Sequence, residues 1–319
     1  MSTLSRLAVI AAIACYSEAF AGPINPPAGP VEPTHKTLTQ VEPRVFLSQD
    51  NTPGDSAATF RITQPGSYYL VSDVLGESGK ISVLIASSDV TVDLMGFTVR
   101  AVIDSVSGIE SAPGQFSNLV VRNGTVSGFS AGAGVLLGQG SSGRGFRVEG
   151  IHSIGNGLVG IGVGESGSVV GCTVTATGGD GILTESNARV EGCVVGDGAG
   201  TGIRTGSSCV VLDCTVRNNA AQGIVVIDRC VVSRCTVGYT VPAARPQGGG
   251  AANTDIPLRE GFGGAGITST SGATITDCVV GGSVGAGIDA GTGSTIRGCT
   301  ARDNGGTGIV TSQSTVSGC

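Results

Sequence analysis

The sequence contains no tryptophan, aromatic residues make up only 4% of it, and charged residues only 13%. A disordered chain would be polar and highly charged, so this composition, with 40% hydrophobic residues, excludes one. Only two histidines are present, His35 and His152, which leaves few possible bases for a Ser–His–Asp triad. A net charge of −6 argues against a nucleic-acid partner, because binding a phosphate backbone requires a basic face.

Glycine is what the sequence has in excess, with 55 of 319 residues. Valine is also frequent, and long runs of good helix formers are missing. Glycine favours tight turns and valine favours strands. The composition therefore predicts many short strands joined by tight corners.

The N-terminus predicts export. Residues 1–21 have the form of a signal peptide, with Arg6 before an apolar run, Leu7–Cys15, that is too short to span a bilayer. Small residues precede a cleavage site after Ala21, and lipoprotein processing at Cys15 is the alternative. Six prolines between residues 22 and 43 predict a linker. We therefore expect a secreted or cell-surface protein, and no later stretch is long enough for a membrane span.

An internal repeat organises the rest of the chain. A Gly-Ile pair recurs, and successive pairs are offset in sequence number by 21, 21, 21, 43, 21 and 21. These pairs are Gly160-Ile161, Gly181-Ile182, Gly202-Ile203, Gly223-Ile224, Gly266-Ile267, Gly287-Ile288 and Gly308-Ile309. A cysteine follows at the same distance after each of the first six isoleucines, at Cys172, Cys193, Cys214, Cys235, Cys278 and Cys299. The offset of 43 is one turn plus an insertion at about residues 239–263.

Upstream of Ile161 the repeat is looser. Ile85, Ile109, Val135 and Ile161 are offset in sequence number by 24, 26 and 26, which indicates earlier turns with longer corners. We expect about ten turns, each with a 21- to 26-residue repeat, over residues 79–319. A cap segment at residues 44–78 is expected to precede them.

The repeat predicts stacked parallel strands. Side chains alternate along a strand, so each cysteine shares a face with the valine two residues later, and the intervening residue, usually threonine, faces solvent. One turn cannot bury its own apolar face, but stacked turns share a continuous core. The predicted fold class is therefore all-β, a parallel β-helix.

The repeat Gly-Ile, Val, Cys-Thr-Val, with Asn219 or Asn304 before the next Gly-Ile, resembles the right-handed parallel β-helix repeats of the pectin-lyase-like superfamily. The segments at residues 60–70 and 90–97 resemble secreted bacterial β-helix proteins of unassigned function. The superfamily includes pectate lyases, polygalacturonases, other glycoside hydrolases, phage tailspikes and adhesins. The resemblance thus implies a right-handed helix but does not choose a function.

Motifs for catalysis are scarce. Asn253-Thr254-Asp255 is similar to one polygalacturonase motif, but the paired-Asp and Arg-Ile-Lys motifs are missing. Asp213 and Asp277 each precede a ladder cysteine, with Arg234 at the same position between them, which indicates an exposed salt-bridge ladder rather than a calcium site. We expect His152 to be a surface residue, and no metal or cofactor is predicted.

The cysteines have two interpretations. In a secreted protein they usually form disulfides. Here six of them form one column, and Cys209 and Cys230, which have the same spacing, form a second. Stacked side chains point the same way, which disfavours disulfides. The sequence has no Cys-x-x-Cys pair of the kind that binds zinc, so a zinc site is not predicted. We therefore expect mostly free, buried thiols that fill the core.

The insertion is the best candidate for function, because loops on a rigid scaffold carry function more often than the scaffold does. By register, it leaves the helix at the edge that carries Arg217 one turn earlier and Arg302 two turns later. The predicted ligand-binding residues are Tyr239, Arg245, Arg259, Arg217, Arg302 and Asp303. The candidate catalytic carboxylates are Asp255 and Glu260.

Three hypotheses follow from the sequence. The first is an extracellular β-helix that binds polysaccharide or another surface component along one edge. The second is a polysaccharide lyase or glycoside hydrolase. The third is a structural or adhesive surface rod. Carboxylates about 5–10 Å apart in a cleft would favour hydrolysis, whereas a flat edge with scattered charges would favour binding or scaffolding.

Overall fold

The computed structural model describes residues 43–238 and 264–319, and the descriptions below apply to these residues. The chain divides into two compact units, Met1–Pro43 and Arg44–Cys319. The predicted signal peptide and linker, residues 1–42, and the insertion, residues 239–263, lie outside the described residues. No helix among the described residues is long and apolar enough to cross a membrane.

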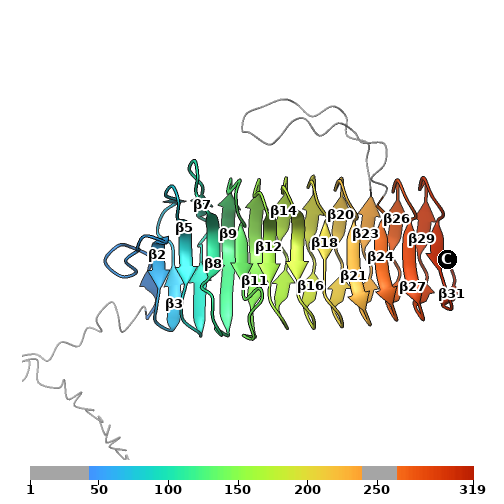
Figure 1. Cartoon of the computed structure of the whole chain (residues 1–319), viewed down its shortest axis with the longest axis horizontal. Helices are drawn as coiled ribbons and strands as arrows, with labels where there is room; N and C mark the ends of the chain where they lie inside the picture. The colour runs from blue at the N-terminus through green and yellow to red at the C-terminus, as the bar shows by residue number, and fades with distance from the viewer. Residues whose placement is uncertain (1–42, 239–263) are drawn as a thin grey trace, which may run out of the picture. The chain divides into compact units, whose positions relative to one another are not determined.

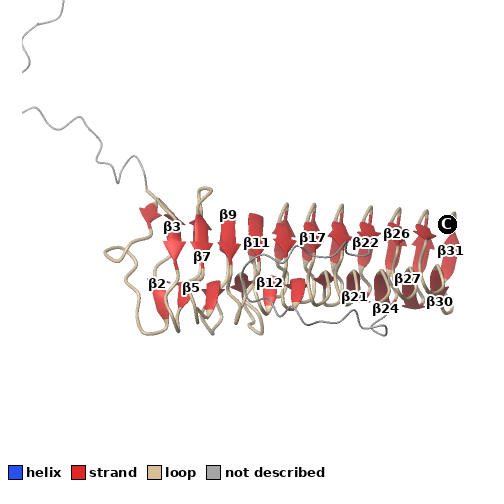
Figure 2. Cartoon of the chain, turned by 90° about the horizontal axis from the view of Figure 1, so that it is seen from above, coloured by secondary structure: helices blue, strands red, loops and turns tan. Residues whose placement is uncertain are grey.

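The second unit is the expected right-handed parallel β-helix, and its strands stack in two sheets (Figures 1 and 2). The 11-stranded sheet contributes one strand to each turn. Its strands are β2 (Ala58–Ile62), β5 (Ile81–Ile85), β8 (Ser107–Ser111), β10 (Val135–Leu137), β12 (Val159–Val163), β15 (Asp180–Thr184), β18 (Ile203–Arg204), β21 (Ile224–Asp228), β24 (Ile267–Ser271), β27 (Ile288–Thr292) and β30 (Ile309–Thr311).

The 20-stranded sheet is bent along its length, so most turns contribute two short strands to it. Before the bend lie β1 (Val45–Phe46), β3 (Gly66–Tyr69), β6 (Val90–Asp93), β13 (Ser168–Val170), β16 (Arg189–Glu191), β19 (Val210–Leu212), β22 (Val231–Ser233), β25 (Thr274–Thr276), β28 (Thr295–Arg297) and β31 (Thr315–Ser317). After the bend lie β4 (Val74–Leu75), β7 (Thr98–Arg100), β14 (Thr173–Thr175), β17 (Val194–Gly196), β20 (Thr215–Arg217), β23 (Thr236–Gly238), β26 (Val279–Gly281) and β29 (Thr300–Arg302). Two longer strands, β9 (Leu119–Ser127) and β11 (Arg147–Ile154), continue through it.

The predicted 21-residue register is confirmed from Ile161 onward. Ile161, Ile182, Ile203 and Ile224 pair in succession, and Ile224 pairs directly with Ile267 across the insertion. The ladder thus continues directly from β21 to β24. One upstream pairing differs from the prediction, because Ile109 pairs with Val83 rather than Ile85. Both side chains lie on the buried face, so alternation alone does not distinguish the two registers.

The bend in the large sheet uses one left-handed residue per turn. The residue before each ladder cysteine has a positive φ, as at Gly171 (59°) and Asp213 (53°), which turns the chain sharply. Arg234 adopts the same conformation (φ 52°) and its guanidinium forms two hydrogen bonds of 2.7 Å with Asp213. The expected salt bridge between stacked turns is therefore present.

The two columns of cysteines lie in the core, as expected, and all nine cysteines of the described residues are free thiols. Eight are buried and Cys319 is exposed. Ladder thiols approach backbone carbonyls, for example Cys193 Sγ to the Glu191 oxygen at 3.3 Å. In the second column the backbone N–H of Cys209 donates to Cys230 Sγ at 3.3 Å. A serine takes the same role further on, since the N–H of Ala273 donates to Ser294 Oγ.

The N-terminal edge of the 11-stranded sheet is covered by the preceding loop. Pro53 forms an antiparallel bridge with Phe60 of β2, and Gln49 Nε2 donates to the Thr59 carbonyl at 3.0 Å. A covered edge strand cannot pair with another chain. This segment, within the predicted cap, therefore closes one end of the stack.

Candidate functional site

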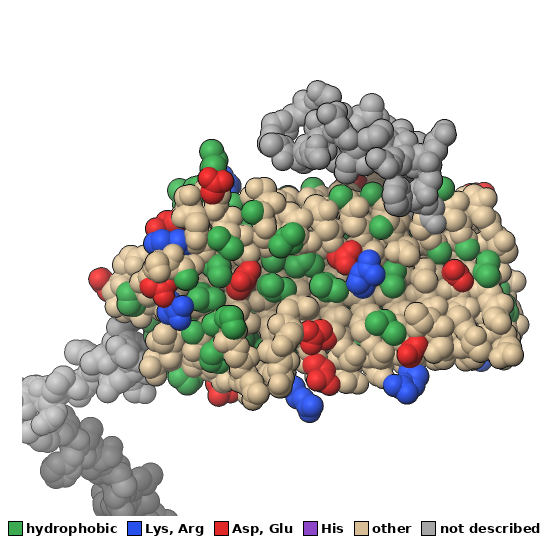
Figure 3. All heavy atoms as spheres, in the orientation of Figure 1, with side chains coloured by type: hydrophobic (Ala, Val, Ile, Leu, Met, Phe, Trp, Pro, Cys, Tyr) green, Lys and Arg blue, Asp and Glu red, His purple; other side chains and the backbone are tan. Residues whose placement is uncertain are grey.

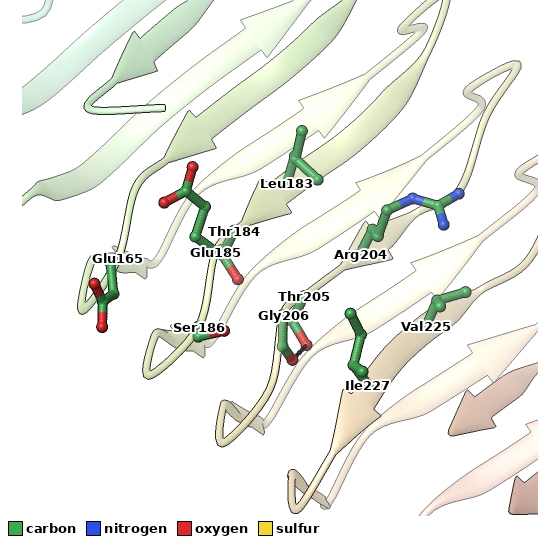
Figure 4. Close-up of a pocket in the computed structure, with 10 residues that line it drawn as sticks. All are labelled: Glu165, Leu183, Thr184, Glu185, Ser186, Arg204, Thr205, Gly206, Val225 and Ile227. Atoms are coloured by element: carbon green, nitrogen blue, oxygen red, sulfur yellow. Dashed lines mark hydrogen bonds between the residues drawn. The ribbon is translucent and has the colours of Figure 1, made fainter. Parts of the chain in front are cut away.

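An open groove of about 630 Å³ lies on the outer face of the 11-stranded sheet. It crosses four consecutive turns, those of β12, β15, β18 and β21. Ten residues line it (Figure 4): Glu165, Leu183, Thr184, Glu185, Ser186, Arg204, Thr205, Gly206, Val225 and Ile227. In the space-filling view, this face of the β-helix carries apolar side chains and scattered charged groups, several of them an acidic side chain next to a basic one (Figure 3).

The groove lies where the repeat shortens. The corner between β10 and β11 spans residues 138–146, whereas the corner between β12 and β13 spans only residues 164–167. The long corner extends over the next turns: Gln139 Nε2 donates to the Val163 carbonyl at 2.9 Å, and the Gly140 N–H donates to Glu185 Oε1 at 2.6 Å. The change from 26- to 21-residue turns therefore places a projecting loop beside short corners.

Two outward columns of side chains form the surface of the groove. Leu183, Arg204 and Val225 occupy equivalent positions on successive strands, as Figure 4 shows. Beside them, Gly206 lies between the turns of Glu185 and Ile227, and its backbone packs closely on the preceding turn, since a Cβ atom there would lie 2.6 Å from Ser186 N. Ile227 is 42% exposed. The surface is thus apolar along much of its length.

The polar groups of the groove are held in place by the protein. Arg204 Nε lies 2.7 Å from Asp180 Oδ2, and Arg204 Nη2 donates to Thr201 Oγ1 at 2.8 Å. Asn187 Nδ2 donates to Glu165 Oε1 at 3.1 Å. Preorganised polar groups on an apolar surface can orient a ligand without reordering on binding.

A separate carboxyl on the same sheet face has an altered acidity. Glu110, on β8, lies between Leu84 and Leu136 in the outward column. Burial raises the pKa of Glu110 above its usual value, and a hydrogen bond from Ser107 partly opposes this. Glu110 does not line the groove. Within the described ranges, no group of three or more His, Cys, Asp or Glu side chains could hold a metal ion.

Of the residues predicted from sequence, five lie outside the described residues: Tyr239, Arg245, Asp255, Arg259 and Glu260. Their roles stay predictions. His152 is exposed on β11, as expected for a surface residue.

The other three predicted residues lie on the bent sheet and not in the groove. Arg217 and Arg302 end β20 and β29, and Asp303 follows directly. The register places Gly238 and Gly281 between the two arginines, so these lie three strand spacings, about 14 Å, apart. The two exposed arginines thus stand in one column of the sheet with two glycines between them, and their role in ligand binding stays a prediction.

Sequence reasoning missed the groove residues Glu165, Glu185 and Arg204. They belong to no motif and stand at ordinary outward positions of the repeat. The available signal was the change in spacing at Ile161, which marks the end of the long corners.

The comparisons with known proteins agree with the fold. A family model described as "Right handed beta helix region" matches residues 115–255. Among curated proteins, no sequence matches the chain.

Several solved structures are similar. The Dettilon tailspike protein is 15% identical with a TM-score of 0.48, and the match covers 81% of this chain and 60% of that one. ORF18 of Geobacillus virus E2 is 10% identical with a TM-score of 0.50, covering 78% of this chain and 53% of that one. The A-module of mannuronan C-5 epimerase AlgE6 from Azotobacter vinelandii is 12% identical with a TM-score of 0.45, and the match covers 80% of this chain and 90% of that one.

The matched family model and the likeness to ORF18 agree with a right-handed parallel β-helix. At such identities they show the fold alone. The chain spans only 60% and 53% of the lengths of the first two structures.

Proposed function

We propose that this protein is a secreted or cell-surface β-helix that binds a polysaccharide in the groove of the 11-stranded sheet. The observation that carries the proposal is the open groove across four turns, with an apolar surface and fixed polar groups. An open groove accepts a long ligand that continues beyond it, whereas small ligands are usually enclosed. Because the turns repeat about every 4.8 Å, a chain of repeating units along the rod would meet a repeating set of side chains.

Binding fits the groove better than catalysis does. A glycosidase needs one carboxyl that donates a proton and a second that acts as base or nucleophile. In the groove, Glu165 and Glu185 each accept a hydrogen bond from the protein itself, and Asp180 is paired with Arg204. The enzymatic alternative rests on Asp255 and Glu260 of the insertion.

A glycan array combined with a product assay on the same polysaccharides tests the proposal. We expect binding without new reducing ends or unsaturated sugars. Products of either kind would establish the lyase or hydrolase alternative instead. If no glycan binds, both polysaccharide hypotheses are wrong and the structural rod is favoured.

Two variants locate the binding surface. Ile227→Ala removes apolar area from the groove, and Val310→Ala is the matched control, since Val310 is 41% exposed on the same sheet but outside the groove. We expect Ile227→Ala alone to weaken binding. Deletion of residues 241–262 removes the inserted length and restores a 21-residue turn. If this deletion abolishes binding while Ile227→Ala does not, the insertion is the site.

A further inference from the structure

The charges of the groove indicate which polysaccharide it takes. The lining contains one basic side chain, Arg204, and two carboxylates, Glu165 and Glu185. Asp180, which lies beside the lining, holds the Arg204 guanidinium at 2.7 Å. The single positive charge is therefore already compensated within the protein.

The two glutamates are not compensated in this way. Their hydrogen-bond donors are neutral: the Asn187 amide at Glu165 Oε1 and the Gly140 N–H at Glu185 Oε1. The second oxygen of each carboxylate accepts no hydrogen bond from the described residues. Within the described part of the groove, two negative charges thus remain available to a ligand. The apolar side chains of Val225 and Ile227 lie in the same groove.

This arrangement has a clear consequence for a charged ligand. A uronate chain would bring its own carboxylates next to Glu165 and Glu185, and like charges placed together disfavour binding. An ammonium group on the sugar would instead form charge-assisted hydrogen bonds with the second carboxylate oxygens.

We propose that the groove selects a polysaccharide built of amino sugars with free ammonium groups, such as a glucosamine polymer. This inference rests on the proposed function, because it names the ligand of the same groove. Glu165 and Glu185 determine the preference, and Asp180 keeps Arg204 from attracting anionic chains.

Calorimetric titration with three short oligomers of equal length tests it: glucosamine, N-acetylglucosamine and galacturonate, at physiological ionic strength. We expect the glucosamine oligomer to bind most tightly and galacturonate most weakly. Each exposed carboxylate–ammonium pair contributes about a 1.5- to 5-fold gain in affinity. Glu165→Gln/Glu185→Gln should remove the preference for glucosamine, and both glutamines can still accept the hydrogen bonds from Asn187 and Gly140.

The control variant is Asp277→Asn/Asp289→Asn, which removes two exposed carboxylates outside the groove. It should keep the preference, which separates local recognition from attraction to the net charge of −6. Asp180→Asn should improve binding of galacturonate by freeing Arg204.

The outcomes separate the two proposals. Equal or tighter binding of galacturonate or N-acetylglucosamine, or an unchanged preference in the double glutamine variant, would overturn the amino-sugar inference alone. If none of the three oligomers binds and the glycan array is also negative, the proposed function itself is wrong.

Discussion

The glycine of each Gly-Ile pair except the last, Gly308, is expected to be essential for stacking. A Cβ atom added at Gly202 would lie 2.4 Å from Val216 Cγ1 and 2.8 Å from the carbonyl oxygen of Gly223, one turn later. Gly181 and Gly223 have the same surroundings, with 2.4 and 2.3 Å to the corresponding valines. Since the carbonyl belongs to the backbone of a stacked turn, the chain cannot relieve the contact by rotating a side chain.

The expected effect of Gly202→Ala is therefore large for one methyl group. Overpacking a well-filled core destabilises by about 1–3 kcal/mol, and we expect the upper end of this range because backbone must move. Gly238→Ala is the control, because a Cβ at Gly238 meets nothing within 4 Å and that residue has no positive φ. Urea denaturation followed by circular dichroism measures both free energies of unfolding.

A double variant sharpens the test. Val216→Ala removes the methyl group that the Cβ introduced by Gly202→Ala would strike, and alone it should destabilise by about 2 kcal/mol. If the contact is the cause, the two effects are not additive. The double variant then loses about 1 kcal/mol less free energy of unfolding than the two single variants lose together. Strict additivity, or a Gly202→Ala variant as stable as Gly238→Ala, would refute the explanation.

Three further predictions concern groups in and around the core. A thiol reagent should label Cys319 quickly in the native protein and the eight buried thiols only on unfolding. The hydrogen bond that the Cys172 thiol donates to Cys193, together with burial, raises the pKa of Cys172, and rapid labelling of several thiols would contradict the buried ladder. Glu110→Gln should stabilise the protein at neutral pH and make its stability in chemical denaturation less dependent on pH. The reason is that the raised pKa of Glu110 makes the folded state less stable as pH rises above the ordinary value of 4.5. An unchanged dependence of stability on pH would exclude this residue as the cause. Asn156→Ala should destabilise by about 3 kcal/mol, since the Asn156 side chain accepts from the Phe129 N–H at 3.1 Å and donates to Ser153 Oγ at 2.9 Å. Gln115→Ala, at an exposed position without a positive φ, should change the urea midpoint little.

The sequence predicted the fold in detail where the repeat is strict. Ile161 and its successors stack as the 21-residue spacing requires, and Ile224 pairs with Ile267, the next isoleucine of the series. The reason is physical: each turn repeats the same buried side chains, so only one register buries them all. Upstream, Val83 and Ile85 share a face, and the hydrophobic pattern had no means to choose between them.

The groove was not predictable in the same way. Its polar residues, Glu165, Glu185 and Arg204, point outward, where the repeat imposes no residue type. One of them, Glu185, also accepts a hydrogen bond from the corner at residues 138–146, two turns earlier. A contact between residues 45 positions apart leaves no local pattern in the sequence.

Because equivalent turns stack on one another, a corner can lengthen without shifting the strands on either side of it. The extra residues of the turn that begins at Val135 fall in the corner between β10 and β11, while the strands on either side keep their register with the next turn. A longer corner can therefore reach over the turns that follow it, as the Gly140 N–H reaches Glu185, while the strands beneath keep their register. In this architecture the surface of the helix can change by the length of one loop without any change in the core.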